Sequence, residues 1–204
     1  MKIYLTRHGQ SEANLHKIIA GHGDYPLTDL VKEQAKALGQ EFLKQDIKFD
    51  TVYASDIVRA AETAKLICKE MGIQQINFDK RLREGDAGVF EGRYSSSLSK
   101  EESEFLESSM REAKDVKVPD GESNLEMTHR IKEVFLELIE NHPEDSTNLI
   151  VGHGGTLYHI LVRVLDLLPG QLDEWFKSCQ VNIIERKSAQ DDWVITMFNS
   201  KELV

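Results

Sequence analysis

Two histidines follow short apolar segments, and each is flanked by glycine. His8 stands in Thr-Arg-His-Gly, just after the apolar amino-terminal segment, and His153 stands in Gly-His-Gly after a second apolar run at 149–151. Glycine allows a sharp turn behind a strand. Because Arg7 precedes His8, two strand-end imidazoles and a guanidinium could form one site. This combination suits a dianionic phosphoryl group, since guanidinium forks bind its oxygens and an imidazole nitrogen can attack phosphorus.

Hydrolysis of a phosphate monoester needs three kinds of group. The phosphoryl oxygens need positive charge, phosphorus needs an in-line nucleophile, and the departing alkoxide needs a proton. Arg7 and Arg59 could provide the charge, and either His8 or His153 could be the nucleophile. Glu84 could be the acid. The sequence therefore offers a candidate for each task.

The motifs around these residues resemble those of the histidine phosphatase (phosphoglycerate mutase-like) superfamily. Five of them occur in the family's order over about residues 2–165. They are Arg7-His8-Gly9 with Ser11 and Asn14, Ser55-Asp56-Ile57-Val58-Arg59-Ala60 with Thr63-Ala64, the segment 82–92 with Glu84 and Glu91-Gly92, Pro119-Asp120-Gly121-Glu122-Ser123, and Gly152-His153-Gly154.

The resemblance implies a role for each matched residue. His8 would be the nucleophile and would be transiently phosphorylated. The phosphate pocket would be lined by Arg7, Asn14, Arg59, His153 and the backbone of Gly154. Glu84 would protonate the leaving group and then help to activate water. No metal and no cofactor are implied, because cationic side chains would take the place of a magnesium ion.

Three features depart from the family pattern or compete with it. Gln10 stands where many relatives carry glutamate, which removes a charge beside the nucleophile. Val31 stands where relatives often carry glycine, and we interpret this as a packing change. Asp86 is a rival to Glu84 for the acid role, although the register of the motif favours Glu84.

The superfamily contains hydrolases and cofactor-dependent phosphoglycerate mutases. Mutases carry Glu-Arg-His-Tyr-Gly at the acid position and a long insert with adjacent arginines; here the tract is Glu84-Gly85-Asp86-Ala87-Gly88, and 85–152 contains no adjacent arginine pair. These differences predict a metal-independent phosphomonoesterase that acts on small phosphorylated metabolites, with sugar phosphates or bisphosphates as options. The alternative is a phosphoglycerate mutase. A non-catalytic phospho-ligand-binding regulator is disfavoured because the nucleophile, the arginines and the acid are all present.

The remaining histidines and both cysteines lie outside these motifs. His16, His22, His129, His142 and His159 are expected to be structural or exposed, although His16 or His22 could border the substrate. Their spacing does not fit a metal site, since no i, i+4 pair with an acidic neighbour occurs. Cys68 and Cys179 stand in apolar segments and are expected to be buried thiols in a reducing compartment.

Strand and helix patterns alternate along the chain. Strands are predicted at about 2–6, 49–54, 75–78, 148–151, 181–186 and 193–198. One helix is predicted after Pro26, with Val31, Ala35, Leu38 and Phe42 on one face, and a second from Ser55 as cap to Met71. A third begins at Ser123, with its capping-box partner Glu126, and runs through Leu138. A fourth runs through Leu157 to Leu168, where Pro169-Gly170 would end it. The alternation predicts an α/β three-layer sandwich with a mostly parallel central sheet, helices on both faces, and a small helical excursion over the active site. In such sheets ligands bind beyond the carboxyl ends of the strands, where both histidine motifs fall.

Length and composition favour a single domain over residues 1–204, with an acidic, serine-rich helical cap inserted at about 94–118. The net charge of -10 argues against a nucleic-acid partner, which prefers a basic surface. No apolar run reaches the roughly 18 residues of a membrane span, and the predicted first strand leaves no space for a signal peptide. We therefore expect a cytoplasmic protein; a monomer and a homodimer are both compatible with the sequence.

Overall fold

The computed structural model describes residues 1–111, 115–167 and 174–202. The strands are β1 (Lys2–Arg7), β2 (Thr51–Ala54), β3 (Asn77–Phe78), β4 (Thr147–Gly152), β5 (Val181–Glu185), β6 (Val194–Phe198) and β7 (Lys201–Glu202). The α-helices are α1 (Glu12–His16), α2 (Asp29–Lys44), α3 (Val58–Met71), α4 (Lys100–Arg111), α5 (Asn124–Asn141) and α6 (Gly154–Tyr158). Short 3-10 turns span Lys80–Leu82 (η1), Gly88–Phe90 (η2) and Ser95–Ser97 (η3), and a π-helical stretch, η4, spans His159–Val164.

The described strands form one mixed sheet in the order β3-β2-β4-β1-β5-β6-β7. The pairs β3-β2, β2-β4 and β4-β1 are parallel, and Arg7 lies opposite Gly152 at the shared carboxyl end of β1 and β4. The pairs from β5 onward are antiparallel. The residues that follow β1 and β4, His8 and His153, therefore emerge side by side from the centre of the sheet.

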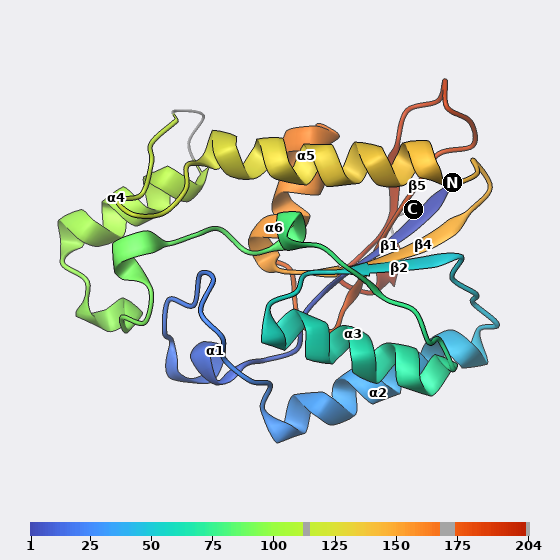
Figure 1. Ribbon diagram of the computed structural model, residues 1–204, viewed down its shortest axis with the longest axis horizontal. Helices are drawn as coiled ribbons and strands as arrows, with labels where there is room; N and C mark the ends of the chain where they lie inside the picture. Colours follow the sequence, from blue (N-terminus) through green and yellow to red (C-terminus); the bar gives the residue numbers. More distant parts are fainter. Residues whose placement is uncertain (112–114, 168–173, 203–204) are drawn as a thin grey trace.

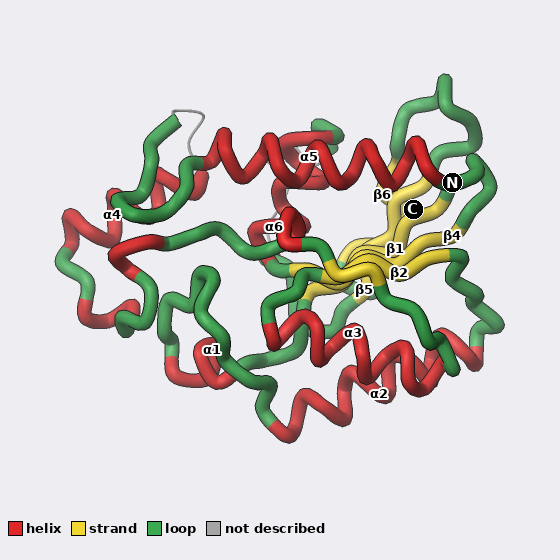
Figure 2. The backbone as a smooth tube through the Cα atoms, in the orientation of Figure 1, coloured by secondary structure: helices red, strands yellow, loops and turns green. Residues whose placement is uncertain are grey.

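Helices cover both faces of the sheet, as Figures 1 and 2 show. Successive side chains of β1 point to opposite faces of the sheet. Ile3 and Leu5 pack in a core with α5, and Tyr4 packs in a core with α2 and α3. Such alternation is expected of a strand that is buried on both sides. The α/β three-layer fold predicted from the sequence is confirmed, and the antiparallel edge from β5 to β7 completes it.

Several details differ from the predicted elements. Ser55 does not cap α3, because Ile57 is the N-cap residue and Ser55 accepts the N–H of Ile57 at 3.3 Å instead. The helix after His153 becomes π-helical at His159 and ends at Val164, earlier than predicted, since residues 165–167 are described and are not helical. The predicted end of that helix, at Leu168 and Pro169-Gly170, lies outside the described residues. The capping box of α5, formed by Ser123 and Glu126, is present as predicted.

The segment at about 94–118 contains η3 and α4, and its residues 112–114 lie outside the described part. It extends from the end of the sheet opposite the amino terminus (Figure 1). Phe90, Leu106 and Val118 join it to the rest of the chain through a small apolar cluster. Within the described residues, no helix is both long enough and apolar enough to cross a membrane.

Candidate active site

His8 is held in one tautomer at the carboxyl end of β1. Its Nδ1 lies 2.6 Å from the carbonyl oxygen of Gly9, and Nε of Arg59 lies 3.2 Å from its Nε2. A carbonyl accepts and a guanidinium only donates, so the proton is on Nδ1 and the lone pair is on Nε2. Burial, followed by the positive charges of Arg59 and Arg7, lowers the pKa of His8 well below its ordinary value. The imidazole is therefore neutral near pH 7, as a nitrogen nucleophile must be.

The backbone beside His8 leaves space for glycine alone. A Cβ atom at Gly9 would collide with Cγ1 of Val31, which is 3% exposed in α2. The N–H of Gly9 donates to Oγ1 of Thr63 at 3.1 Å, and that hydroxyl donates to the carbonyl of Arg59. Val31 thus fixes the turn by packing, and Thr63 connects the His8 turn to the helix that carries Arg59.

Arg59 is a buried guanidinium on the first turn of α3, and its nitrogens are directed at three acceptors. Besides His8, it donates from Nη1 to the carbonyl of Gly23 at 2.9 Å and from Nη2 to that of Gly21 at 2.8 Å. Arg7 donates from Nη1 to the carbonyl of Phe176, while its buried Nε has no partner among the described residues. Burial lowers the pKa of both arginines, and the nearby carboxylate of Glu84 opposes that effect.

His153 is fully buried beside His8, with 5.0 Å between the two ring centroids. Its Nε2 lies 2.8 Å from Oγ of Ser55, whereas its Nδ1 has no partner among the described residues. Burial, and then the charge of Arg59, lowers the pKa of His153 well below the ordinary value. A buried polar nitrogen without a partner is costly. Together with the unpartnered Nε of Arg7, it indicates a place where a polar ligand binds.

Glu84 lines the same cavity as His8, from the loop between η1 and η2. One carboxylate oxygen accepts the N–H of Gly155 at 3.2 Å, and the other accepts the N–H of Gly85 at 3.0 Å. The rival, Asp86, also lines the cavity, but its Oδ1 accepts the N–H of Gly88 within the next turn. Glu84 is therefore the carboxylate that is hydrogen-bonded to the segment after His153, and this favours Glu84 over Asp86 as the acid.

Arg130 holds the Glu84 loop in place, and sequence reasoning missed it. From α5 its guanidinium donates to the carbonyls of Arg81, Arg83 and Glu84, each at 2.8 Å. It is also paired with Glu122, whose Oε1 accepts the N–H of Asp86 at 2.9 Å. Glu122 stands in a motif noted in the sequence, but no spacing rule connects that motif to an arginine on the following helix.

These residues surround a cavity of about 570 Å³. Arg7, His8, Asn14, Arg59 and Glu84 line it directly. His153 lies buried beneath it, against His8 and Ser55. Gly154 is also buried and packs against Trp175; its neighbour Gly155 is at the cavity wall. The wall is completed by Ile18, Ile19, Ala20, Gly21, Gly85, Asp86, Ala87, Leu106, Ser109, Val118, Glu122, Ser123, Asn124, Met127, Tyr158, His159 and Trp175.

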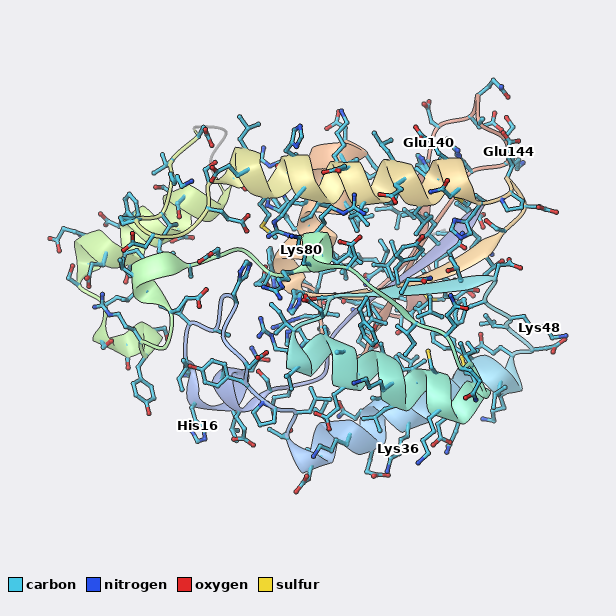
Figure 3. The ribbon with its side chains drawn as sticks, viewed as in Figure 1. His16, Lys36, Lys48, Lys80, Glu140 and Glu144 are labelled. Carbon is cyan, nitrogen blue, oxygen red and sulfur yellow. The ribbon has the colours of Figure 1, made fainter. Side chains whose placement is uncertain are left out.

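Three of the other histidines differ in their relation to this cavity. His16 lies at the end of α1, exposed and near Glu12, and Figure 3 shows it at the edge of the molecule. His22 contacts the site indirectly, through a hydrogen bond of 2.9 Å between its Nε2 and the carbonyl of Glu84. His159 is part of the cavity wall and is bonded to Oγ1 of Thr128, and burial lowers its pKa to about 3.

Comparison with known proteins identifies the family of the chain. The chain matches the histidine phosphatase superfamily (branch 1) over residues 3–201. It is 30% identical over 200 residues to a protein of Salmonella arizonae named a probable phosphoglycerate mutase, covering 96% of this chain and 91% of that protein. A counterpart in Salmonella choleraesuis matches to the same extent.

Two solved structures share the fold. The α-ribazole phosphatase from Shigella flexneri has a TM-score of 0.80 at 25% identity and covers 100% of this chain and 99% of its own. A mycobacterial glucosyl-3-phosphoglycerate phosphatase has a TM-score of 0.83 at 21% identity and covers 98% and 99%. With the family match extending over nearly the whole sequence, this chain belongs to the histidine phosphatase superfamily.

Proposed function

We propose that this protein is a phosphomonoesterase that works through a phosphohistidine at His8. The observation that carries the proposal is the fixed tautomer of His8, whose unprotonated Nε2 faces the guanidinium of Arg59 at 3.2 Å. The likeness of the chain to the α-ribazole phosphatase from Shigella flexneri supports the proposal that it is a hydrolase. The substrate would be a small phosphorylated metabolite, without a nucleic-acid or membrane partner. The whole chain would form one domain, to which about 94–118 contributes a cap.

In the first step, Nε2 of His8 attacks phosphorus as the bond from phosphorus to the alcohol oxygen breaks. The Nε–H of Arg59 turns from His8 to a phosphoryl oxygen, joined there by Arg7 and by the unpartnered Nδ1 of His153. Such charge stabilisation is usually the largest contribution to phosphoryl transfer. Asn14, at the cavity wall, would contact the same group, as would the backbone of Gly154.

Glu84 handles the protons in both steps. Its carboxyl group gives a proton to the departing alkoxide, so that a neutral alcohol leaves. A water molecule then attacks the phosphohistidine while the Glu84 carboxylate takes its proton. Phosphate departs, the bond from nitrogen to phosphorus breaks, and His8 returns to its neutral form. Its two backbone donors, from Gly85 and Gly155, keep the carboxylate in position through the cycle.

We propose that the reaction needs no metal, because Arg7, Arg59 and His153 already surround the phosphoryl site. The described residues contain no group of three or more histidine, cysteine or acidic side chains that could hold an ion. Turnover should persist after exhaustive treatment with EDTA. Loss of turnover that magnesium or zinc restores would contradict this part of the proposal.

A phosphoglycerate mutase is the second candidate, because relatives that are 30% identical carry that name. Mutases transfer the phosphoryl group back to the substrate, which requires exclusion of water and a firm hold on the substrate carboxylate. The deciding assay supplies 3-phosphoglycerate with catalytic 2,3-bisphosphoglycerate and follows both 2-phosphoglycerate and free phosphate. Rapid isomerisation with little free phosphate would overturn the hydrolase.

The intermediate itself provides the direct test. Protein mixed with a ³²P-labelled phosphate ester and quenched in base should carry an acid-labile label on His8. His8→Ala should carry none and should lose nearly all turnover while keeping its circular dichroism spectrum. Label on a serine or cysteine would overturn the assignment of the nucleophile.

A further inference from the structure

The cavity wall beyond the phosphoryl site is notably poor in positive charge. Among the described residues that line the cavity, the lysines and arginines are Arg7 and Arg59, and both lie beside His8. His159 adds no charge, because burial lowers its pKa to about 3. The acidic residues of the described wall are Glu84, Asp86 and Glu122.

The rest of this wall is largely apolar. Ile18 and Ile19 follow α1, Leu106 is part of α4, and Val118 and Met127 also line the cavity. In the same wall, Tyr158 and Trp175 stack with 5.8 Å between ring centroids and an interplanar angle of 26°. Trp175 remains 45% exposed, so part of its surface is available to a ligand.

Three cationic groups beside the described part of the wall are already paired. Arg130 is bound to Glu122 and to three carbonyls, and Arg93 is bound to Glu102 through two hydrogen bonds. Lys117 donates to Glu126 at 2.7 Å. A second anionic group on the substrate would thus lose its water and meet carboxylates and apolar side chains, which is unfavourable without a paired cation.

We propose that the substrate carries a single phosphate on an uncharged alcohol with an apolar, and preferably aromatic, face. The proposal rests on the proposed phosphomonoesterase activity and deepens it. The two arginines bind the one phosphoryl group, while Ile18, Trp175 and their neighbours contact the alcohol. Phosphoglycerates and sugar bisphosphates, which carry a second anionic group, are poor substrates on this account.

The test uses ester pairs that differ in one charge. 4-Carbamoylphenyl phosphate and 4-carboxyphenyl phosphate are close in size, and so are glycerol 3-phosphate and 3-phosphoglycerate. In each pair the member without the carboxylate should have the higher kcat/KM, by roughly tenfold or more, because burying the unpaired carboxylate of the other member costs free energy. Equal values, or a preference for the charged member, would overturn the proposal.

A charge-insertion variant provides the second arm. Ile18→Lys places a cation in the cavity wall and should reduce the preference for the neutral member of each pair at least several-fold. Leu15→Lys is the matched control, since Leu15 is 52% exposed on neighbouring α1 and outside the wall. It adds the same net charge and should leave the ratio unchanged. A ratio that shifts equally in both variants, or in neither, would contradict the assignment of the wall.

Nitrophenyl phosphate separates this inference from the underlying activity. Its turnover with a label on His8 establishes the phosphomonoesterase, and the charge-matched ratios then decide the substrate class alone. Absence of phosphate release from every ester would overturn both. Release that is fastest from 3-phosphoglycerate or a bisphosphate would overturn only the inference.

Discussion

Nε of Arg59 lies 3.2 Å from Nε2 of His8, while the two Nη atoms of the same guanidinium are bound to the carbonyls of Gly21 and Gly23. The planar guanidinium is thereby anchored at two corners and presents its third nitrogen to the nucleophile. A phosphoryl group attacked by His8 would arrive within reach of this donor. The arrangement makes the shape of Arg59, as well as its charge, important for the reaction.

Arg59→Lys should therefore lower kcat/KM by about 100-fold or more, although the positive charge is kept. A lysine ammonium is a point charge and cannot serve both carbonyls and the phosphoryl group. Inhibition by vanadate should weaken in parallel, because vanadate can mimic the trigonal bipyramidal transition state. Arg83→Lys is the control, since Arg83 pairs with Asp56 at a partly exposed site outside the cavity wall. Near-normal kcat/KM in Arg59→Lys would show that charge alone matters, and comparable losses in both variants would show that the effect is not specific to Arg59.

The free energy of unfolding should depend on pH because His159 is buried in its neutral form. Burial lowers the pKa of His159 to about 3, whereas an unfolded histidine titrates near its ordinary value of 6.5. Between these values the unfolded chain binds the proton and the folded chain does not. The stability that neutral His159 contributes should thus be fully present above pH 6.5. The free energy of unfolding should fall as the pH is lowered towards 3, and His159 should add a slope of about 1.4 kcal/mol per pH unit near pH 5.

Denaturant unfolding of His159→Gln at several pH values checks this slope. The variant should be less stable at pH 7.5 and should lose less stability on acidification than the parent protein. Thr128→Val removes the hydrogen bond to Nδ1 of His159 without removing a titrating group. It should lower stability and keep the parent slope; an unchanged slope in His159→Gln would refute the assignment.

Arg130 should act on the reaction through the position of Glu84, because it holds the 81–84 backbone and contacts no cavity surface itself. Arg130→Met should lower kcat for alkyl esters by about tenfold to 100-fold, leave vanadate affinity nearly unchanged, and alter the pH profile of kcat. Arg130→Lys should recover part of the loss. Lys132→Met, at an exposed position on the same helix, serves as the control. A loss confined to thermal stability, with normal kcat at low temperature, would make Arg130 a purely structural residue.

The sequence predicted the juxtaposition of His8 and His153 better than the surroundings of these residues, for a physical reason. His8 and His153 follow strands that pair directly, so apolar runs and flanking glycines were enough to place them together. Arg130 and Ser55 are brought to the site by tertiary packing. The prediction that Ser55 caps α3 is wrong, because the common role of serine as a cap does not show that its hydroxyl bonds to His153. The π-helical turn at His159 likewise has no periodic signal, so its place in the cavity wall could not be predicted.

The contribution of Glu84 should depend on the alcohol that leaves. An aliphatic alkoxide is a strong base and departs slowly without a proton, whereas nitrophenolate departs readily unaided. Glu84→Gln keeps an oxygen that can accept from Gly85 or Gly155 but cannot supply the proton. It should thus lower kcat/KM for an alkyl phosphate by roughly 100-fold to 10,000-fold and for nitrophenyl phosphate far less. Asp86→Asn is the matched control, because Asp86 lines the same cavity but is bound within its own turn. Equal losses for the two esters in Glu84→Gln, or a steeper leaving-group dependence in Asp86→Asn, would transfer the acid role away from Glu84.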